Sequence, residues 1–317
     1  MNLRDLKYVI AVAETNHFGK AAEHCFVSQP TLSGQIKKLE EELGVTIFER
    51  TNRSVEITPI GESILEHARI MVEQANVITQ LAQAHQDPLA GPLRIGVIPT
   101  LSPYLMPLIL VPIRKQHPQM NLVLSEEMTD TLLERLHNHE IDAALLATEA
   151  DSQDLKAMDL FDEPLWIAYP SKHPFYTKEK ISRRDLDDAN LLLLSEGHCL
   201  AKQVMDVCHL KERKDQGDMA DLRASSLETL LQLVSAGFGT TLVPALAMRG
   251  SWATGSGIAT QKLEFKDAYR RISLVYRKSF PRQQALDAFA KIIFENLPNT
   301  VYPLVKNKRA GKKRKKS

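Results

Sequence analysis

The chain has few cysteines and no long hydrophobic run, and both shortages restrict what it can be. Three cysteines in 317 residues are too few for the disulfide framework of a small secreted protein. No uninterrupted apolar stretch approaches the ~18 residues that span a bilayer. The first residues place Asp5 and Glu14 among apolar positions, which is a poor match to a signal peptide. We therefore expect a reduced, cytoplasmic protein that does not bind membranes.

Several familiar catalytic motifs are also missing. The sequence contains no G-x-S-x-G, no P-loop and no H-E-x-x-H segment. Its 44% hydrophobic and 25% charged residues are ordinary for a globular protein, which excludes a disordered or collagen-like chain. At roughly 150 residues per domain, the length predicts about two domains. We expect no metal and no cofactor.

The net charge of +1 conceals a basic C-terminus. Residues 306–317 hold eight Lys or Arg and no acid, so the remaining chain carries 32 basic and 39 acidic side chains. We expect residues 301–317 to form a disordered basic tail, which can hold a polyanion. A solvated tail that only improves solubility explains the run equally well. The tail by itself does not predict nucleic-acid binding.

Residues 1–58 predict a helix-turn-helix followed by a wing. Two short helical patterns lead to a third helix that begins at Ser28, a good N-cap. Apolar residues at i, i+4, i+7 and i+11 give this third helix one buried face, formed by Leu32, Ile36, Leu39 and Leu43. Residues 46–58 then indicate two short strands around a turn at 52–54. Two helices and a short turn have the form of a helix-turn-helix.

The opposite face of the third helix has the composition of a surface that enters the major groove of DNA. Small residues permit close approach, Gln and Thr or Ser address base edges, and Lys pairs with phosphate. The candidate DNA-binding residues are Arg4, Gln29, Pro30, Thr31, Ser33, Lys37, Arg50 and Arg53. Residues 1–58 hold seven basic and eight acidic side chains, so the acids at 40–42 must face away from phosphates. An ordinary helical hairpin stays an alternative.

Residues 59–86 predict one long helix. Its apolar residues are spaced 4-3-4-3-4 and form an a/d seam of Ile64, Ala68, Met71, Ala75, Ile78 and Ala82. One helix cannot bury such a seam alone, so we expect a dimerisation helix, with docking onto its own domain as the alternative. Two prolines and a glycine break the pattern, which makes residues 87–92 a hinge.

From residue 93 onward, short apolar strands alternate with helical stretches. The predicted strands are 93–98, 121–125, 142–147, 165–169, 191–194, 240–244 and 272–276. This alternation predicts a parallel α/β sheet arranged in two small lobes with a cleft between them. We place this domain at 93–300, with lobe I at about 93–162 and 268–300 and lobe II at about 163–267.

Cys199 and Cys208 lie nine residues apart across a stretch that favours helix. Nine helical residues span about 13.5 Å at 1.5 Å each, whereas a disulfide needs Cα atoms within about 7 Å. A disulfide between them must therefore unwind the helix, which would make oxidation a conformational switch. His198, Lys202 and the helix N-terminus each favour the thiolate of Cys199, and Cys208 is placed to capture a sulfenic acid.

Other interpretations of the cysteines stay open. Most cytosolic cysteine pairs are unlinked thiols, and Cys208 fits the core of a helix. A zinc site using His198, Cys199, Cys208 and His209 is a further alternative, although the spacing is outside the usual range. Cys25 reads as a small buried core residue.

The N-terminal segment resembles the LysR-type transcriptional regulators. The resemblance rests on Phe18, residues 21–22, 28–33, Ile36, 39–40, 43–44, 48–50, 58–59 and Gly61. It covers the whole chain except the basic tail. It implies a winged helix-turn-helix, a linker helix and an effector domain like type 2 periplasmic binding proteins. It also implies tetramers built as dimers of dimers.

The C-terminal part resembles the peroxide-sensing branch of that family. The matching segments are 98–100, 103–105, 197–199 with Cys208, 225–230, 236–237, 242–246 and 274–277. The resemblance implies that Cys199 is the peroxidatic thiol and Cys208 the resolving one, with Thr100, Thr129 and His198 in the peroxide pocket. It also implies reduction by a glutaredoxin or thioredoxin system. The residues 248–260 and the tail depart from the pattern.

These patterns together predict a transcriptional activator rather than an enzyme. We expect it to bind promoter operators as double-stranded DNA, to act with RNA polymerase as a homodimer or homotetramer, and to sense hydrogen peroxide. One alternative is a LysR-type regulator that binds a small metabolite in its cleft, with passive cysteines. Another is a thiol peroxidase that turns over through Cys199 and Cys208.

Overall fold

The chain folds into two units that join after the long helix. The computed structural model describes residues 1–50, 55–150, 152–187, 189–208, 223–249 and 257–304. Contacts within the chain separate Met1–Asp87 from Pro88–Ser317. Among the described residues, no helix is long and apolar enough to cross a membrane.

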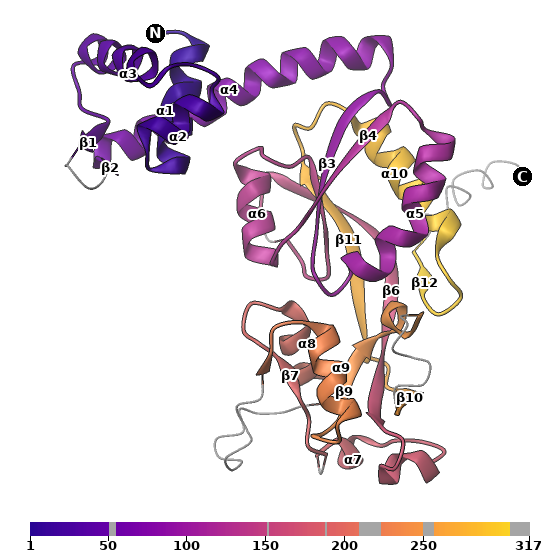
Figure 1. Ribbon diagram of the computed structural model, residues 1–317. Helices are drawn as coiled ribbons and strands as arrows, with labels where there is room; N and C mark the ends of the chain where they lie inside the picture. The colour runs from indigo at the N-terminus through magenta and orange to yellow at the C-terminus, as the bar shows by residue number, and fades with distance from the viewer. Residues whose placement is uncertain (51–54, 151, 188, 209–222, 250–256, 305–317) are drawn as a thin grey trace, which may run out of the picture. The chain divides into compact units, whose positions relative to one another are not determined.

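The first unit contains the predicted helix-turn-helix, a two-stranded wing and the long helix (Figure 1). Its elements are α1 (Leu3–Thr15), α2 (Phe18–His24), α3 (Gln29–Leu43), β1 (Phe48–Arg50), β2 (Val55–Ile57) and α4 (Pro59–Gln86). Ser28 caps α3, because its hydroxyl accepts a hydrogen bond from the backbone N–H of Thr31. The predicted inner face of α3 is confirmed by burial of Leu32, Ile36 and Leu39, while Leu43 at the helix end is exposed.

The turn between α2 and α3 holds an aromatic residue in an unfavourable backbone conformation. Phe26 has φ of +54°, in the left-handed region, and its side chain is 96% exposed. Left-handed backbone brings Cβ close to the following carbonyl oxygen, and Asn and Gly tolerate this better than other residues. Phe26 therefore costs stability without burying apolar surface in return.

The long helix α4 is buried at its start and exposed further along. It packs against α1, and its early positions Leu65 and Ala68 are buried. Further along, Met71 and Ile78 of the predicted seam are exposed, Ile78 by 68%. The first turns therefore dock on the same unit, and dimerisation through the later turns stays a prediction.

The second unit is built on a mixed sheet. Its elements are β3 (Gly91–Val97), β4 (Met120–Glu126), β5 (Ala143–Leu146), β6 (Leu155–Pro170), β9 (Thr241–Pro244), β10 (Ile258–Lys262), β11 (Tyr269–Arg277) and β12 (Tyr302–Pro303). The strand order is β10-β6-β11-β5-β3-β4, and β9 and β12 also pair with β6. The strands β3, β4 and β5 are parallel, whereas β6 and β11 pair antiparallel with their neighbours. The short strands β7 (Leu193–Leu194) and β8 (Arg223–Ala224) pair with each other.

The expected parallel sheet is found for β3, β4 and β5, and the expectation is wrong for β6 and β11, which pair antiparallel. The strand β6 is 16 residues long, whereas the sequence predicted a strand only over 165–169. Its first half was missed because Asp159, Asp162 and Glu163 interrupt the apolar pattern. The chain leaves the first lobe through β6 and returns through β11 after the elements of the second lobe, so these two strands run antiparallel.

Two separate apolar cores define two lobes. The first lobe packs α5 (Ser102–Gln116), α6 (Thr129–His137) and α10 (Gln283–Asn296) around β3, β4 and β5. The second lobe packs α7 (Arg183–Asp187), α8 (Cys199–Val207) and α9 (Leu227–Ser235) around β9 and the end of β6. Strands β6 and β11 lead from one lobe into the other (Figure 1). The short 3-10 helices η1 (Pro174–Thr177) and η2 (Ala245–Arg249) complete the second unit.

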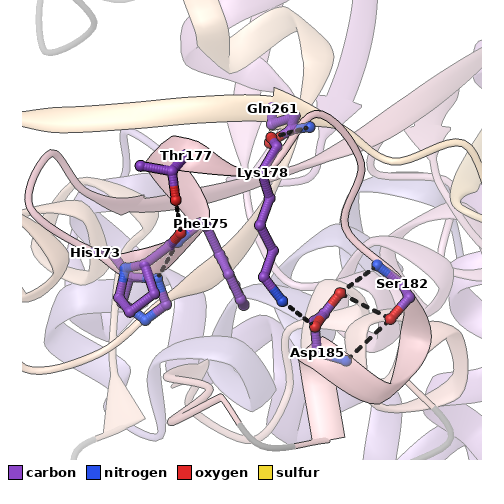
Figure 2. A network of polar contacts seen from close by, with 8 residues as sticks. His173, Phe175, Thr177, Lys178, Ser182, Asp185 and Gln261 are labelled. Atoms are coloured by element: carbon purple, nitrogen blue, oxygen red, sulfur yellow. Dashed lines mark hydrogen bonds and ion pairs between the residues drawn. The ribbon is translucent and has the colours of Figure 1, made fainter.

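A polar network holds the segment from η1 to α7 in the second lobe (Figure 2). Lys178 and Ser182 both donate to the carboxylate of Asp185, and Gln261 on β10 donates to the carbonyl oxygen of Glu179. The bonds from Lys178 and Ser182 lower the pKa of Asp185 to about 2. These contacts are internal to the lobe and have a structural role.

The conformation of Phe26 generates a stability prediction. Phe26→Asn should raise the free energy of unfolding by about 0.5–1 kcal/mol, because Asn adopts the left-handed region at lower cost. Urea denaturation of the full chain measures the change. Phe26→Ala lacks the short polar side chain that hydrogen-bonds locally in this conformation, so it should give no comparable gain. Equal denaturation midpoints for the Asn variant and the natural chain would contradict the prediction.

Candidate functional site

The outer face of α3 is an uncovered surface of small, polar and cationic side chains. Gln29, Pro30, Thr31 and Lys37 are exposed, and Ser33 is half-buried. A Cβ placed at Gly34 would meet no atom within 4 Å, so the helix is open to close approach there. This face has the shape and chemistry that a helix in a major groove requires.

The acidic residues of α3 bind other groups of the first unit. The Glu40 carboxylate accepts hydrogen bonds from the backbone N–H groups of Ile47 (2.7 Å) and Phe48 (3.1 Å), at the start of the wing. Glu42 pairs with the N-terminal ammonium of Met1 at 2.6 Å, and Glu41 lies 3.8 Å from Lys37. These contacts explain how a unit without excess positive charge keeps its outer helix face free of uncompensated acids.

The remaining predicted DNA-binding residues are only partly placed. Arg4 is exposed near the start of α1. Arg50 is at the end of β1, where its backbone pairs with Val55, but its side chain lies outside the described residues. Arg53 is one of residues 51–54, which are also outside them.

The helix α8 separates Cys199 from Cys208. Cys199 is its first residue and Cys208 its C-cap, as the sequence predicted from the helical pattern. Both are thiols here, as is Cys25. Cys199 packs against the core of the first lobe, whereas Cys208 is 1% exposed within the core of the second. A disulfide between them therefore requires both loss of helix and removal of at least one sulfur from its core.

His198 holds the loop that leads into α8. It is buried, and its Nε2 lies 3.0 Å from the carbonyl oxygen of Ser225, next to β8. A carbonyl oxygen only accepts, so Nε2 carries the hydrogen. The preceding Gly197 has φ of +95°, and a Cβ there would lie 3.9 Å from Cγ of Met128. The loop before Cys199 thus lies beside the start of α6.

Thr129 is the first residue of α6 and has a buried hydroxyl group. Its Oγ1 has no hydrogen-bond partner among the described residues. A buried hydroxyl without a partner is costly, and native structures rarely keep one without a functional reason or a bound molecule. Thr129 directly follows Met128, whose Cγ lies beside Gly197.

Thr100 follows β3 and is bound by an arginine that sequence analysis missed. Arg270 donates to the Thr100 hydroxyl at 2.7 Å and to its carbonyl oxygen at 2.9 Å. The same guanidinium binds Glu163 at 2.9 Å, and both side chains are fully buried. Glu163 in turn accepts from the backbone N–H of Leu246 at 2.8 Å. The Thr100 oxygen thus accepts from Arg270 and keeps its own hydrogen available to donate.

Two further polar contacts, also missed from sequence, join the lobes near these residues. Gln203 on α8 donates to the carbonyl oxygen of Ala147 at 2.7 Å, while its Oε1 is buried without a partner among the described residues. Tyr104 on α5 donates to Glu228 on α9 at 2.7 Å. Burial and this bond raise the pKa of Tyr104, so it stays a donor. Isolated polar residues on helices give no sequence signal for such contacts.

Thr100, Thr129 and the Gln203 contact belong to one edge of the sheet. They follow β3, β4 and β5 respectively, and the carboxyl ends of parallel strands meet at the same edge. Among the residues that the structure describes, no group of three or more His, Cys, Asp or Glu is placed to hold a metal. His209 of the zinc alternative lies outside them.

A helix-turn-helix unit joined to a two-lobed α/β effector unit defines a class of bacterial regulatory protein. The family described as "Bacterial regulatory helix-turn-helix protein, lysR family" matches residues 3–62, and "LysR substrate binding domain" matches residues 86–298. The chain therefore belongs to the LysR family, which confirms the resemblance predicted from its sequence.

Within this family the chain is similar to regulators named for hydrogen peroxide. It is 39% identical to the hydrogen peroxide-inducible genes activator of Pectobacterium carotovorum subsp. carotovorum, covering 96% of this chain and all of the relative. It is also 39% identical to the transcriptional dual regulator OxyR of Escherichia coli K12, over 92% of this chain and 95% of the relative.

Solved structures of OxyR have the same fold. A cysteine variant of full-length OxyR from Pseudomonas aeruginosa matches with a TM-score of 0.76 and 38% identity, over 94% of this chain and 99% of that one. A peroxide-bound cysteine variant of OxyR from Corynebacterium glutamicum matches with a TM-score of 0.62 and 36% identity, over 93% and 92%. The predicted fold class is confirmed.

Proposed function

We propose that the chain is a hydrogen peroxide-responsive transcription regulator whose signal is oxidation of Cys199. The observation that carries the proposal is the position of Cys199 and Cys208 at opposite ends of α8, each packed on a different lobe. Similarity to peroxide-inducible activators over nearly the whole chain supports it. A switch of this kind works where thiols are returned to the reduced state, so we place the protein in the cytoplasm.

The chemistry requires only peroxide and two thiols. The Cys199 thiolate attacks one peroxide oxygen, the O–O bond breaks, and hydroxide leaves, which produces a sulfenic acid. The thiolate of Cys208 then attacks that sulfur, and hydroxide leaves as the disulfide forms. The two hydroxides take up the two protons that the thiols released. In total, two thiols and one peroxide yield one disulfide and two waters. A glutaredoxin or thioredoxin system supplies the two electrons that restore the thiols.

Thr100, Thr129 and His198 are the proposed peroxide pocket. The free hydrogen of Thr100 and the hydroxyl of Thr129 are the groups available to bind peroxide oxygens. His198 holds the loop before Cys199 through its bond to Ser225. Disulfide formation then unwinds α8, which breaks the Gln203 contact to the first lobe. This gives the effector unit two arrangements that differ in redox state.

DNA binding is assigned to the outer face of α3, with the wing and Arg4 beside it. The candidate residues are Arg4, Gln29, Pro30, Thr31, Ser33, Lys37, Arg50 and Arg53. Gln29 is at the N-terminus of α3, where recognition helices address base edges, and Lys37 is about two turns further along and exposed. The exposed part of α4 is the proposed dimer contact, and a homotetramer acting with RNA polymerase completes the proposal.

Two alternative functions can be distinguished from the proposed sensor by experiment. A LysR-type regulator that binds a small metabolite in its cleft would leave the cysteines unmodified at low peroxide. A thiol peroxidase would consume peroxide continuously in the presence of thioredoxin. We propose instead a sensor that reacts once per reduction cycle.

The first test is Cys199→Ser, which removes the attacking sulfur. After about one equivalent of hydrogen peroxide, peptide mass mapping of the natural chain should recover Cys199 cross-linked to Cys208. Cys199→Ser should give no cross-link and no change in its DNA footprint.

Cys25→Ser is the matched control. Burial and the charge of Glu14 raise the pKa of Cys25, which keeps it a poorly reactive thiol. This variant should respond like the natural chain. A footprint that still changes in Cys199→Ser would overturn the mechanism, and unmodified thiols in the natural chain would favour the cleft ligand.

Thr129→Val tests the peroxide pocket. Removal of a buried hydroxyl without a partner should raise the stability of the reduced protein by about 1 kcal/mol. Loss of the same hydroxyl should slow oxidation of Cys199 by about tenfold, the rate equivalent of one lost hydrogen bond. Stopped-flow thiol loss measures the rate, and Thr129→Ser should retain it. Oxidation of the Val variant at the natural rate would remove Thr129 from the pocket.

Gln29→Ala and Lys37→Ala separate base reading from phosphate binding. A duplex selected by the natural chain from a random-sequence pool is the probe. Gln29→Ala should cost about 1–3 kcal/mol on this duplex and relax its preference at one position. Lys37→Ala should weaken binding to all duplexes and lower the salt slope by about 0.9. Lys156→Ala, on β6, should change neither. Unaltered sequence preference in Gln29→Ala would contradict its assignment.

A further inference from the structure

The chain is anchored to the first lobe almost immediately after the long helix ends. Helix α4 ends at Gln86, and Leu89 already packs against the first core. Pro88, between them, has a fixed φ. The covalent path between the two units is therefore very short, and its stiffness depends on how firmly residues 89–94 are held.

These residues are held on an edge that lacks a neighbouring strand. Strand β3 pairs with β4 from Gly91 onward, but with β5 only from Ile95. Peptide groups of alternate residues point to the same edge of a strand. Without β5 beside them, the carbonyl oxygens of residues 90 and 92 need other partners.

Arg282 supplies those partners. It directly precedes α10, is 2% exposed, and donates to the carbonyl oxygens of Pro92 and Ala90 at 2.5 Å each. The planar guanidinium binds two acceptors in a fixed geometry, and bonds from a charged donor are stronger than neutral ones. One buried side chain thus replaces two bonds of the missing strand.

Asp142 continues this arrangement. Its buried carboxylate accepts from the backbone N–H of Arg94 at 2.8 Å, and its own N–H donates to the Arg94 carbonyl oxygen at 2.8 Å. Burial raises the pKa of Asp142, and the charges of Arg94, Arg277 and Arg282 oppose that rise. The anion and the cation thus lie within electrostatic range, and between them they bind the backbone from residue 90 to residue 94.

We propose that Arg282 is a positioning residue that couples the effector unit to the DNA-binding unit. It keeps the start of β3 bound to the first lobe, so the two move together. A displacement of the first lobe therefore also displaces residues 87–89 and the end of α4. The inference takes a redox response of the effector unit from the proposed function but does not depend on which cysteines carry it. Arg282 has no part in the thiol chemistry itself.

Arg282→Lys is the variant that tests the coupling. Lysine keeps the positive charge but cannot hold both carbonyl oxygens in the forked geometry. The full-length variant should lose thiols to peroxide at the natural rate, and its reduced form should bind the selected duplex as before. The difference in affinity or footprint between its reduced and oxidised forms should shrink by about fivefold or more.

Arg277→Lys is the matched control. Arg277 is also buried and also donates to two backbone carbonyl oxygens, those of Leu136 (2.6 Å) and Ile141 (2.7 Å), between α6 and β5. This variant should keep the full difference between redox states. An undiminished difference in Arg282→Lys, or an equal loss in Arg277→Lys, would overturn the inference. Failure of the natural chain to respond to peroxide would instead refute the proposed function.

Hydrogen exchange in the natural chain gives a second, independent test. The amide N–H of Gly91 donates to the carbonyl oxygen of Gln119 at 3.1 Å, and that of Arg94 to Asp142. If the segment is a rigid connection, both amides should exchange slowly in the reduced and the oxidised protein. Rapid exchange in either state would show that the segment opens and would contradict the coupling role, even if Arg282→Lys failed to fold.

Discussion

The effector unit depends on a buried ion pair at the meeting point of its two lobes. Arg270 and Glu163 lie opposite each other on β11 and β6, the strands that lead from one core to the other. Arg270 also binds Thr100 of the first lobe, and Glu163 binds the start of η2 behind β9. Breaking a buried ion pair leaves an uncompensated charge, which is strongly unfavourable. The pair therefore holds the sheet edge that carries Thr100 in a fixed position relative to both lobes.

While the Arg270–Glu163 ion pair keeps the lobes in place, α8 is the element whose conformation is able to change. Its two thiols are held apart by helix geometry and by packing on different cores, and Gln203 adds a hydrogen bond to the first lobe. After reaction at Cys199, formation of the disulfide therefore requires loss of the α8 helix and of the packing of its thiols. A covalent switch requires a local element with two mutually exclusive states, here a helix with two thiols or an unwound segment with a disulfide, next to a part of the structure that does not change. Within the same unit, Arg282 holds the start of β3 through the carbonyl oxygens of Pro92 and Ala90.

Much of the fold was predictable because it follows from interactions between residues that are close together in the sequence. The caps and the apolar spacing placed α3 and its buried face, and the length and seam of α4 followed from periodicity. The mixed sheet was not predictable, because the first half of β6 carries Asp159, Asp162 and Glu163, whose partners Arg270 and Arg271 lie over a hundred residues away. Of the site, the two cysteines and His198 had a sequence signal, whereas Arg270 and Gln203 had none.

The sequence by itself determined the family, the helix-turn-helix, the linker helix and the nine-residue spacing of the thiols, since these depend on neighbouring residues. Only the tertiary structure decided that Cys199 packs against one core while Cys208 is buried in the other, that Glu40 binds backbone N–H groups at the wing, and that Arg282 replaces a missing strand. The physical reason is that burial and hydrogen-bond partners depend on contacts between residues far apart in the chain. A charged side chain looks the same in sequence whether solvent surrounds it or a distant carbonyl oxygen binds it.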